Sequence, residues 1–252
     1  MKIDFPTTDQ IPGLRRLWKQ AFADEDEFLD SFFATGFAPN RCLCVSMENT
    51  VAAALYWMDM TCRGANIAYI YAVATDKDHQ NQGLCRNLME KAHAILETRN
   101  YAGSILVPED DALAAMYERH GYRFCTSISQ FVSTVGPYAA AGHRIDKEEF
   151  LRRREALLPD GGVQLGRAAL DFLDSQVFFF AGADFLATGM KGTQGFRCLE
   201  LLGNTAAAPE ILNALGLTHG SFRAPGDGRP FAMYRPIDPN IAAPTYLGFA
   251  FD

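Results

Sequence analysis

The sequence lacks a long run of purely apolar residues. Its most apolar later segment, residues 177–190, contains Asp184 and is shorter than the roughly 20 residues that a membrane-spanning helix needs. The first ten residues, MKIDFPTTDQ, hold no apolar signal core. We therefore expect a cytoplasmic protein that has no membrane partner and is not secreted.

Positive charge is scarce. Lys and Arg together number 23 against 30 Asp and Glu, and the formal net charge is -7. Nucleic-acid binders usually carry a basic face, so this balance disfavours a nucleic-acid partner and suits a cationic substrate better. The local run of arginines at 152–154 stands beside Glu148, Glu149 and Glu155, which favours a solvated helix face.

Paired metal-ligand spacings are also missing. None of the six cysteines forms a C-x-x-C pair, so we expect no metal and a reducing compartment. The chain has neither the Gly-Lys-Ser/Thr ending of a Walker loop nor the G-x-G-x-x-G of a dinucleotide-binding turn. These absences exclude the commonest phosphate-binding motifs.

The first half of the chain shows regular periodicity. Thr7 and Gln10 have capping-box spacing before a helix predicted over 10–24, and a second helix is expected over 27–33. Three β-rich runs follow and read as an antiparallel meander. These runs cover residues 41–47, 50–60 and 65–75.

The next segments predict a strand, loop and helix unit. A polar loop over 76–82 precedes a helix opened by Gly83. A short buried strand over 104–108 leads to a helix capped by Asp110 or Asp111. Gly121 suits the left-handed cap that ends this helix, and another strand is expected over 122–132.

The second half of the chain predicts further α/β structure. The small, turn-rich stretch 133–142 is the expected boundary between a domain over 1–135 and a second, smaller one over 144–252. The expected elements there are a charged helix over 146–157, strands over 176–182 and 196–203, a helix over 209–215 and a hairpin around 226–228. The fold class is therefore α/β of the α+β type, with a mixed, mostly antiparallel sheet flanked by helices.

The segment Gln80-Asn81-Gln82-Gly83-Leu84-Cys85 leaves a strand and enters a helix. Consecutive backbone N–H groups at such a positive helix end form a cradle for phosphate. Gly83 allows close approach of the backbone. Arg86, just inside the helix, adds a charge-assisted contact to a phosphate oxygen.

At this point the chain resembles the GCN5-related N-acetyltransferases (GNAT), whose pyrophosphate loop reads Q/R-x-x-G-x-G/A. Gln80 and Gly83 match that loop, and Cys85 stands where Gly or Ala is usual. Downstream, LVPEDDALAAMYERHGYRF resembles the family's strand, its tyrosine-bearing helix and the Y-E-K-x-G-F ending. The resemblance covers roughly the first half of the chain and implies a GNAT sheet there.

The resemblance implies acetyl-CoA as the cosubstrate and assigns roles to individual residues. Tyr117 would lie beside the thioester sulfur and protonate the leaving thiolate, and a phenol with a pKa of about 10 stays protonated at neutral pH. The alternative is that Tyr117 is only a core aromatic. The residues implied to contact the coenzyme are Val73, Ala74, Thr75, Gln80, Asn81, Gln82, Gly83, Leu84, Cys85, Arg86 and Asp110. Asp110 stands where many relatives carry Asn.

The group that takes a proton from the amine stays open among several residues. His79, His120, Asp59 and Glu109 are candidates. The layout of the chain also resembles two-domain acetyltransferases related to the mycobacterial enhanced-intracellular-survival proteins, in which the terminal carboxylate handles protons. That resemblance implies a role for Asp252, against the alternative that the apolar tail is a closing edge strand.

The same resemblance makes 144–252 a GNAT-like, coenzyme-free domain that shapes the acceptor site. Together these features predict transfer of an acetyl group from acetyl-CoA to a primary amine of a small molecule or peptide, by direct attack in a ternary complex and without a metal. The alternative is a non-catalytic sensor that binds acyl-CoA. Tyr117 favours the enzyme, whereas Cys85 and Asp110 are the departures that favour the sensor.

Overall fold

The computed structural model describes residues 2–47, 50–137, 139 and 141–251 and divides into two compact units. The first unit runs to Arg123 and also contains Leu165–Phe172 and Met233–Ala242; the second comprises Phe124–Gln164, Leu173–Ala232 and the segment from Ala243 onward. Two short segments from the second half of the chain thus belong to the first unit. The assignment of separate functional domains to 1–135 and 144–252 stays a prediction.

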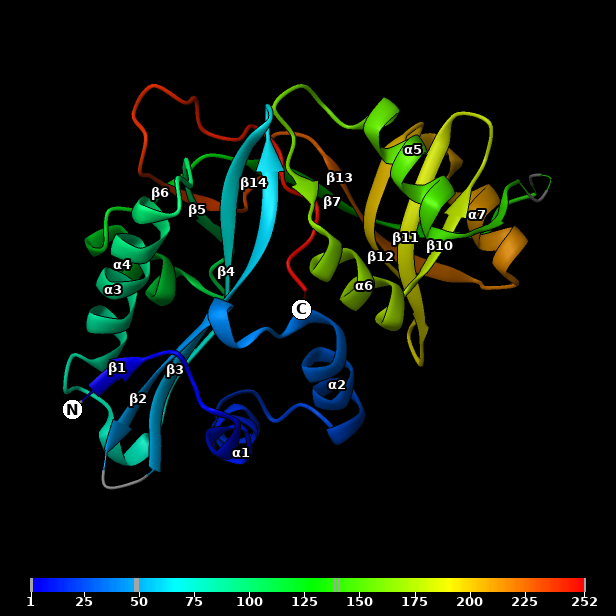
Figure 1. Ribbon diagram of the computed structural model, residues 1–252. Coiled ribbons are helices and arrows are strands. Elements are labelled where there is room, and N and C mark those ends of the chain that lie inside the picture. Colours follow the sequence, from blue (N-terminus) through cyan, green and yellow to red (C-terminus); the bar gives the residue numbers. More distant parts are fainter. Residues whose placement is uncertain (1, 48–49, 138, 140, 252) are drawn as a thin grey trace. The chain divides into compact units, whose positions relative to one another are not determined.

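A mixed sheet forms the centre of the first unit, with the strand order β1-β2-β3-β4-β5-β15 (Figure 1). Its longer strands are β1 (Lys2–Asp4), β2 (Cys42–Met47), β3 (Thr50–Cys62), β4 (Ala65–Thr75), β5 (Gly103–Leu106) and β15 (Met233–Pro236). Two short strands, β6 (Arg123–Phe124) beside β15 and β9 (Gln164–Leu165) beside β3, complete it. β4 and β5 pair in parallel, and the other neighbours in this order are antiparallel. The predicted meander of three strands is confirmed as β2, β3 and β4.

Helices cover both faces of this sheet. The first-unit helices are α1 (Ile11–Phe22), α2 (Asp26–Ser31), α3 (Leu84–Thr98) and α4 (Asp111–Arg119), with a π-helical turn η2 (Phe32–Gly36) and short turns η1 (Thr8–Gln10), η3 (Pro39–Arg41) and η4 (Lys77–His79). Figure 1 shows α1 and α2 together, apart from α3 and α4. The α6 helix (Arg167–Gln176) and the short strands β6 (Arg123–Phe124) and β9 (Gln164–Leu165) occur where the chain passes between units.

Alternation along β3 and β4 separates the two faces. Leu55, Trp57 and Ile70 belong to the core cluster that includes the apolar side of α3. Tyr56 and Tyr71 point the other way, to the α1 side, where the Trp18 ring centroid lies 5.2 and 5.5 Å from theirs. Because both faces are covered, these strands read as nearly continuous apolar runs in the sequence.

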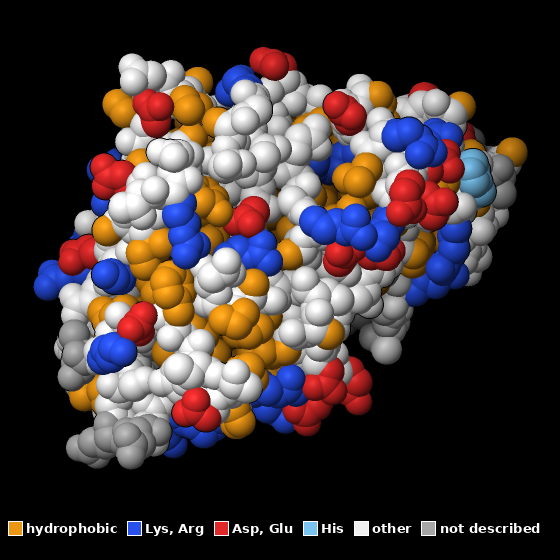
Figure 2. Space-filling model, in the orientation of Figure 1, with side chains coloured by type: hydrophobic (Ala, Val, Ile, Leu, Met, Phe, Trp, Pro, Cys, Tyr) orange, Lys and Arg blue, Asp and Glu red, His pale blue; other side chains and the backbone are white. Residues whose placement is uncertain are grey.

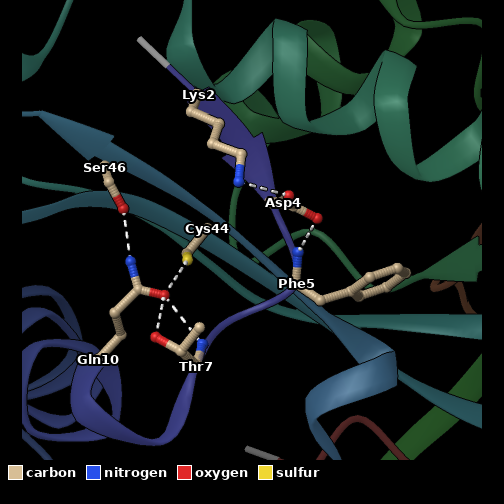
Figure 3. A network of polar contacts seen from close by, with 7 residues as sticks. All are labelled: Lys2, Asp4, Phe5, Thr7, Gln10, Cys44 and Ser46. Carbon is tan, nitrogen blue, oxygen red and sulfur yellow. Dashed lines mark hydrogen bonds and ion pairs between the residues drawn. The ribbon is translucent and has the colours of Figure 1, made fainter.

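The N-terminal segment is fastened by the predicted capping-box residues (Figure 3). The side-chain oxygen of Gln10 accepts hydrogen bonds from the Thr7 backbone N–H at 2.9 Å and from the Thr7 hydroxyl at 3.1 Å. The Gln10 amide group donates to the Ser46 hydroxyl at 2.6 Å. These bonds explain why α1 begins where the spacing of Thr7 and Gln10 indicates, and they tie its start to β2.

A second mixed sheet forms the centre of the second unit, in the order β14-β7-β13-β12-β11-β10-β8. Its strands are β7 (Ser127–Thr134), β8 (His143–Ile145), β10 (Phe178–Ala181), β11 (Phe185–Gly192), β12 (Gly195–Gly203), β13 (His219–Pro225) and β14 (Arg229–Pro230). Only the β12–β13 pairing within this order is parallel. The helical elements are α5 (Lys147–Leu157), α7 (Ala208–Leu215) and the turn η5 (Thr205–Ala207).

The prediction of a β-hairpin around residues 226–228 is wrong. The strands on either side of this turn, β13 and β14, do not pair with each other, because β7 lies between them in the sheet. Ile128 of β7 is in register with both Pro225 and Arg229. A Gly-Asp-Gly turn signal describes local backbone conformation and does not determine which strand becomes the partner.

A buried ion pair joins the helix and sheet of the second unit. Arg154 Nε donates to Glu200 at 2.8 Å and Nη2 donates at 3.0 Å, with both side chains 1% exposed. Arg154 Nη1 donates to the Val163 carbonyl at 2.9 Å. The arginine run that the sequence assigned to a solvated face therefore has one fully buried member.

The apolar segment near the end of the chain packs in the second unit without forming a strand, unlike the closing edge strand given above as the alternative. Its apolar side chains are buried: Tyr246, Leu247, Phe249, Ala250 and Phe251. Tyr246 makes a single bridge with Gly162, and Arg154 lies 5.1 Å from the Phe249 ring centroid. Asp252 lies outside the described residues.

The surface carries both signs of charge. On the face drawn in Figure 2, Lys and Arg side chains are interspersed with Asp and Glu. Among the described residues, no helix combines the length and apolar character needed to cross a membrane.

Candidate functional site

The two middle strands of the first sheet separate partway along their length. β4 is in register with β5 from Ile67 opposite Gly103 to Tyr69 opposite Ile105, where the register ends. On its other edge, β4 stays paired with β3 as far as Thr75. Residues 70–75 of β4 therefore continue beyond the point where pairing with β5 ends. On the edge that faced β5, their backbone N–H and C=O groups have no neighbouring strand within the described residues to pair with.

A β-bulge lies within residues 70–75, the part of β4 that is not paired with β5; below, its free side is called the unladdered edge. Tyr56 pairs with Tyr71 and Ala54 with Ala74, so two residues of β4, Ala72 and Val73, oppose a single residue of β3. Ala72 has φ of +49°, the left-handed region that a residue with a Cβ rarely occupies. Bulges re-aim the strand and are common beside active sites. The strained alanine marks this point of β4 as a candidate functional position.

The loop after β4 is fastened at its beginning by Asp76. The Asp76 backbone N–H donates to the Ala52 carbonyl at 2.8 Å, and its carboxylate accepts from the Asp78 backbone N–H at 3.0 Å. Arg16 Nη1 donates to the same carboxylate at 2.9 Å. The Arg16 hydrogen bond holds the pKa of Asp76 below its usual range, so this carboxylate is ionised at neutral pH.

The predicted cradle occupies the end of this loop and the start of α3. Asn81 and Gly83 both have left-handed backbone, with φ of 62° and 75°. Gly83 is the N-cap, and the Asn87 amide donates to its carbonyl at 3.0 Å. The amides of Leu84, Cys85 and Arg86 precede that first helical bond, so the helix itself offers them no acceptor. A Cβ built on Gly83 meets no atom within 4 Å.

The side chains of the cradle differ in exposure. Gln80, Asn81, Gln82, Gly83 and Arg86 are exposed, Cys85 is half-buried and Leu84 is buried. Leu84 and Cys85 pack into the core cluster and thereby fix the first turn of α3. Burial raises the pKa of the Cys85 thiol, which keeps it protonated and disfavours a nucleophilic role.

Tyr117 lies on the buried side of α4. It belongs to the same core cluster as Leu84 and Cys85 and is 8% exposed. Burial raises the pKa of its phenol well above the usual value, with Cys85 and Tyr122 as further causes. The hydroxyl is therefore protonated at every physiological pH, as a proton donor must be.

The Asp110 carboxylate caps α4. It accepts a hydrogen bond from the Leu113 backbone N–H at 2.8 Å, the usual function of an N-cap aspartate. This structural role is sufficient to explain the residue type. A contact between Asp110 and the coenzyme stays a prediction.

The candidates for the base differ in their surroundings. Asp59 is held by Arg41 at 2.7 Å and by the Tyr101 hydroxyl at 2.5 Å. His79 Nδ1 lies 3.6 Å from the Asp76 carboxylate. Burial lowers the pKa of His120, which ends α4. Glu109 is exposed.

Strand, loop and helix thus place Val73 to Thr75 and Gln80 to Arg86 on one continuous stretch, and Cys85 packs against the core cluster that contains Tyr117. Two features of the site are not predicted from the sequence: the bulge at Ala72 and the Arg16–Asp76 ion pair. No local motif distinguishes that alanine, and the pair joins residues that are far apart in the sequence. In the described part of the chain, no group of three or more His, Cys, Asp and Glu is arranged to hold a metal.

Comparisons with known proteins agree with this geometry. Residues 2–125 match the family described as acetyltransferase (GNAT) domain. No curated protein matches the sequence. Among solved structures, a GCN5-related N-acetyltransferase from Kribbella flavida has a TM-score of 0.70 at 17% identity, over 94% of this chain and 72% of that one.

Two further solved structures share the fold over nearly the whole chain. A GCN5-related N-acetyltransferase from Anabaena variabilis has a TM-score of 0.72 at 15% identity, over 93% of this chain and 72% of that one. Eis1 from Mycobacterium abscessus has a TM-score of 0.67 at 12% identity, over 94% of this chain and 74% of that one. At these identities the similarity shows a shared fold.

Proposed function

We propose that this chain, whose residues 2–125 belong to the acetyltransferase (GNAT) domain family, transfers an acetyl group from acetyl-CoA to a primary amine. The observation that carries the proposal is the continuity of three features. β4 leaves its ladder with β5 after Tyr69, it is bulged at Ala72, and it leads through a loop fastened at Asp76 into the open helix start at Gly83.

The start of α3 fits the phosphate groups of the cosubstrate. Three amides ahead of the first helical bond lie at the positive end of a 15-residue helix, and Gly83 leaves room for close approach. Arg86 is exposed and lies 4.0 Å from Glu90, an exposed pair that is too weak to keep the guanidinium from a phosphate. Gln80, Asn81 and Gln82 complete the proposed coenzyme contacts.

The unladdered edge of β4 fits an extended amide-containing chain and the acetyl carbonyl. Backbone groups of Val73, Ala74 and Thr75 would bind the arm of the cosubstrate by adding hydrogen bonds where the β5 ladder has ended. The Val73 N–H is the proposed donor to the carbonyl oxygen, which gains negative charge as the amine attacks. The bulge at Ala72 aims this part of the strand.

Acetyl-CoA supplies an activated acyl group on a thiol leaving group. In the proposed reaction the amine nitrogen bonds to the carbonyl carbon, the carbon–sulfur bond breaks, and Tyr117 gives its proton to the departing sulfur. The proton lost by the amine goes to a base or to water. Asp252 is a proposed member of this proton-handling machinery, and the acceptor class is a primary amine of a small molecule or peptide.

The test measures release of free thiol from acetyl-CoA across a panel of amines, with coenzyme affinity measured by calorimetry. Tyr117→Phe should lower kcat by about 10²-fold or more, the usual contribution of a positioned acid, and leave coenzyme affinity within about twofold. A variant lacking Asp252 tests the second assignment. Unchanged kcat in Tyr117→Phe would refute the role of the phenol.

The competing function is a sensor that binds acyl-CoA without transferring the acyl group. Its support is that Cys85 replaces a smaller residue and that the Asp110 carboxylate is used as a helix cap. Tight coenzyme binding without amine-dependent thiol release would favour the sensor. Failure to bind coenzyme would contradict both functions.

A further inference from the structure

Three polar side chains meet inside the apolar core of the first unit. Ser104 of β5 and Tyr122, just after α4, are completely buried, and His93 of α3 is 7% exposed. The Ser104 and Tyr122 hydroxyl oxygens lie 2.6 Å apart. His93 Nε2 lies 2.9 Å from the Ser104 oxygen and 3.0 Å from the Tyr122 oxygen. We call these residues the buried triangle.

The buried triangle is uncharged. Burial lowers the pKa of His93 to about 3, and the positive charge of Arg235 adds to this effect. Burial also raises the pKa of Tyr122 well above its usual value. A core network of neutral groups is stable only when its members satisfy one another, and it then specifies one arrangement of the elements that carry them.

The buried triangle has no access to a substrate. A serine hydroxyl 2.9 Å from a histidine nitrogen is a familiar nucleophile–base pair. Here, however, the Ser104 side chain is completely enclosed, and its third partner is a buried tyrosine. Any effect of these groups on the reaction must therefore pass through residues that they hold in place.

Tyr122 is in direct contact with the proposed acid. The rings of Tyr117 and Tyr122 are T-shaped, with centroids 5.8 Å apart. The Tyr122 backbone N–H donates to the Tyr117 carbonyl at 3.1 Å. Hydrogen bonds to β5 and α3 fix Tyr122, so the Tyr117 ring packs against a ring that cannot easily move.

The other members of the buried triangle belong to elements of the proposed coenzyme site. His93 lies on α3, the helix whose first turn forms the cradle. Ser104 lies on β5 and is in register with Ala68 of β4, just before the two strands separate. A displacement within the buried triangle would therefore move Tyr117, the proposed acid, relative to the start of α3 and to residues 70–75 of β4.

We propose that Tyr122, held by Ser104 and His93, is a positioning residue that fixes the Tyr117 hydroxyl for proton transfer. This inference rests on the proposed function. It predicts that removing the Tyr122 hydroxyl lowers kcat and does so only while Tyr117 is present. Tyr122→Phe keeps the ring and deletes only the two hydrogen bonds of the hydroxyl.

The kinetic test is a double-mutant cycle between Tyr122→Phe and Tyr117→Phe. Alone, Tyr122→Phe should lower kcat by about 10-fold with KM for acetyl-CoA within about twofold, because a small misplacement of a catalytic group acts on kcat. In the Tyr117→Phe background it should cause no further loss. Equal losses in both backgrounds, or a rise in KM alone, would overturn the proposal.

Tyr56→Phe is the matched control. It makes the same chemical change at a buried tyrosine of the same unit, on the α1 side of the sheet, outside the buried triangle. It should leave kcat within about twofold of the wild type. Ser104→Ala removes the other end of the Ser104–Tyr122 hydrogen bond and should reproduce the kcat loss of Tyr122→Phe.

A spectroscopic test separates this inference from the proposed function. With tyrosine labelled at the ring carbon that bears the hydroxyl, the NMR signal of Tyr117 is assigned by its loss in Tyr117→Phe. That signal should shift or broaden in Tyr122→Phe and stay unchanged in Tyr56→Phe. An unchanged Tyr117 signal in Tyr122→Phe refutes the positioning role, whereas absence of amine-dependent turnover in the wild type refutes the proposed function.

Discussion

Arg16 of α1 donates to the Asp76 carboxylate at 2.9 Å and, with its other terminal nitrogen, to the Val51 carbonyl at 2.9 Å. A single guanidinium thus joins a helix on one face of the sheet to the start of the loop that leads into the cradle. The Asp76 side chain is only 8% exposed, whereas that of Arg16 is 49% exposed. We call the Arg16–Asp76 ion pair the clamp, because Arg16 holds the start of the loop in place and is also the cationic partner of the buried Asp76 carboxylate.

Arg16→Met should weaken binding of coenzyme A. Without the clamp, the loop before Gly83 samples more conformations, and binding must then order it. We expect the Kd from calorimetry to rise about 3- to 10-fold, equivalent to roughly 1 kcal/mol. Arg15→Met is the matched control, because Arg15 lies on the same helix and forms its ion pair with exposed Asp30. Equal Kd values for the two variants would contradict the assignment.

Asp76→Asn should remove a pH dependence of stability. The pKa of Asp76 is lowered in the folded chain, chiefly by the Arg16 hydrogen bond. A lowered carboxyl pKa contributes stability above the unfolded value of about 3.9, and this contribution is lost as the pH falls through the folded pKa. The melting temperature of the wild type should exceed that of Asp76→Asn by a constant amount above about pH 5 and by less below about pH 4. A difference that does not vary between pH 3 and pH 7 would disprove it.

Gly83→Ala should reduce coenzyme affinity more than stability. Gly83 has φ of 75° and a Cβ there meets no atom within 4 Å, so the alanine pays only the left-handed backbone cost of about 1 kcal/mol. The added methyl would, however, occupy the space that a phosphate needs. Gly216→Ala makes a matched change in the second unit, since Gly216 has φ of 67° and is equally open.

Both alanine variants should therefore lose similar stability in urea denaturation. Only Gly83→Ala should weaken coenzyme A binding in calorimetry. If Gly216→Ala weakens binding as much, the effect is not local to the cradle. If Gly83→Ala binds as the wild type does, the phosphates do not approach Gly83.

Local patterns predicted the parts of the site that are contiguous in sequence. The strand, loop and helix start were recognisable because their alternation, their Gly83 and their helical period all lie within one short segment. The bulge at Ala72 was not, since it depends on how β3 and β4 align and an alanine carries no bulge signal.

Contacts between segments that are distant in sequence explain the remaining differences. β15 adds to the edge of β5, and residues 165–172 belong to the first unit although they follow the predicted boundary. Neither placement has a local cause, because edge pairing is decided by which apolar surface remains uncovered. The buried triangle is similar, since each of its members alone is an ordinary residue in an apolar segment.

Arg154→Met should destabilise the second unit. It leaves the Glu200 carboxylate, which is 1% exposed, without its bidentate partner. Breaking a buried pair on one side typically costs about 3–5 kcal/mol, and replacing both partners by apolar residues recovers much of that. Arg153→Met, which removes a half-exposed pair with Glu149 and a hydrogen bond to the Gly182 carbonyl, is the control and should cost about 1–2 kcal/mol, less than Arg154→Met.

Urea denaturation of Arg154→Met and of the double variant Arg154→Met with Glu200→Leu distinguishes the causes. The double variant should be more stable than Arg154→Met alone. If the two are equally unstable, the loss comes from packing around Arg154, including its contact with the Phe249 ring, and not from the orphaned carboxylate.

His93 should make the first unit less stable as the pH falls below neutrality. Its pKa is lowered from 6.5 to about 3 in the folded chain by burial, with Arg235 and His120 as the nearby positive or ionisable groups. Between these two values the unfolded chain holds a proton that the folded chain does not. The free energy of unfolding should therefore decrease with falling pH, by up to about 1.4 kcal/mol per pH unit for this one proton.

His93→Gln removes that titration while keeping a polar side chain beside Ser104 and Tyr122. Urea denaturation at pH 7.5, 6.5, 5.5 and 4.5 should show the wild type losing its advantage over His93→Gln as the pH decreases. His143→Gln, at an exposed histidine of the second unit, should keep the wild-type pH dependence. Parallel curves for the wild type and His93→Gln would show that His93 takes up its proton in the folded state, and the buried triangle would then be charged below neutrality.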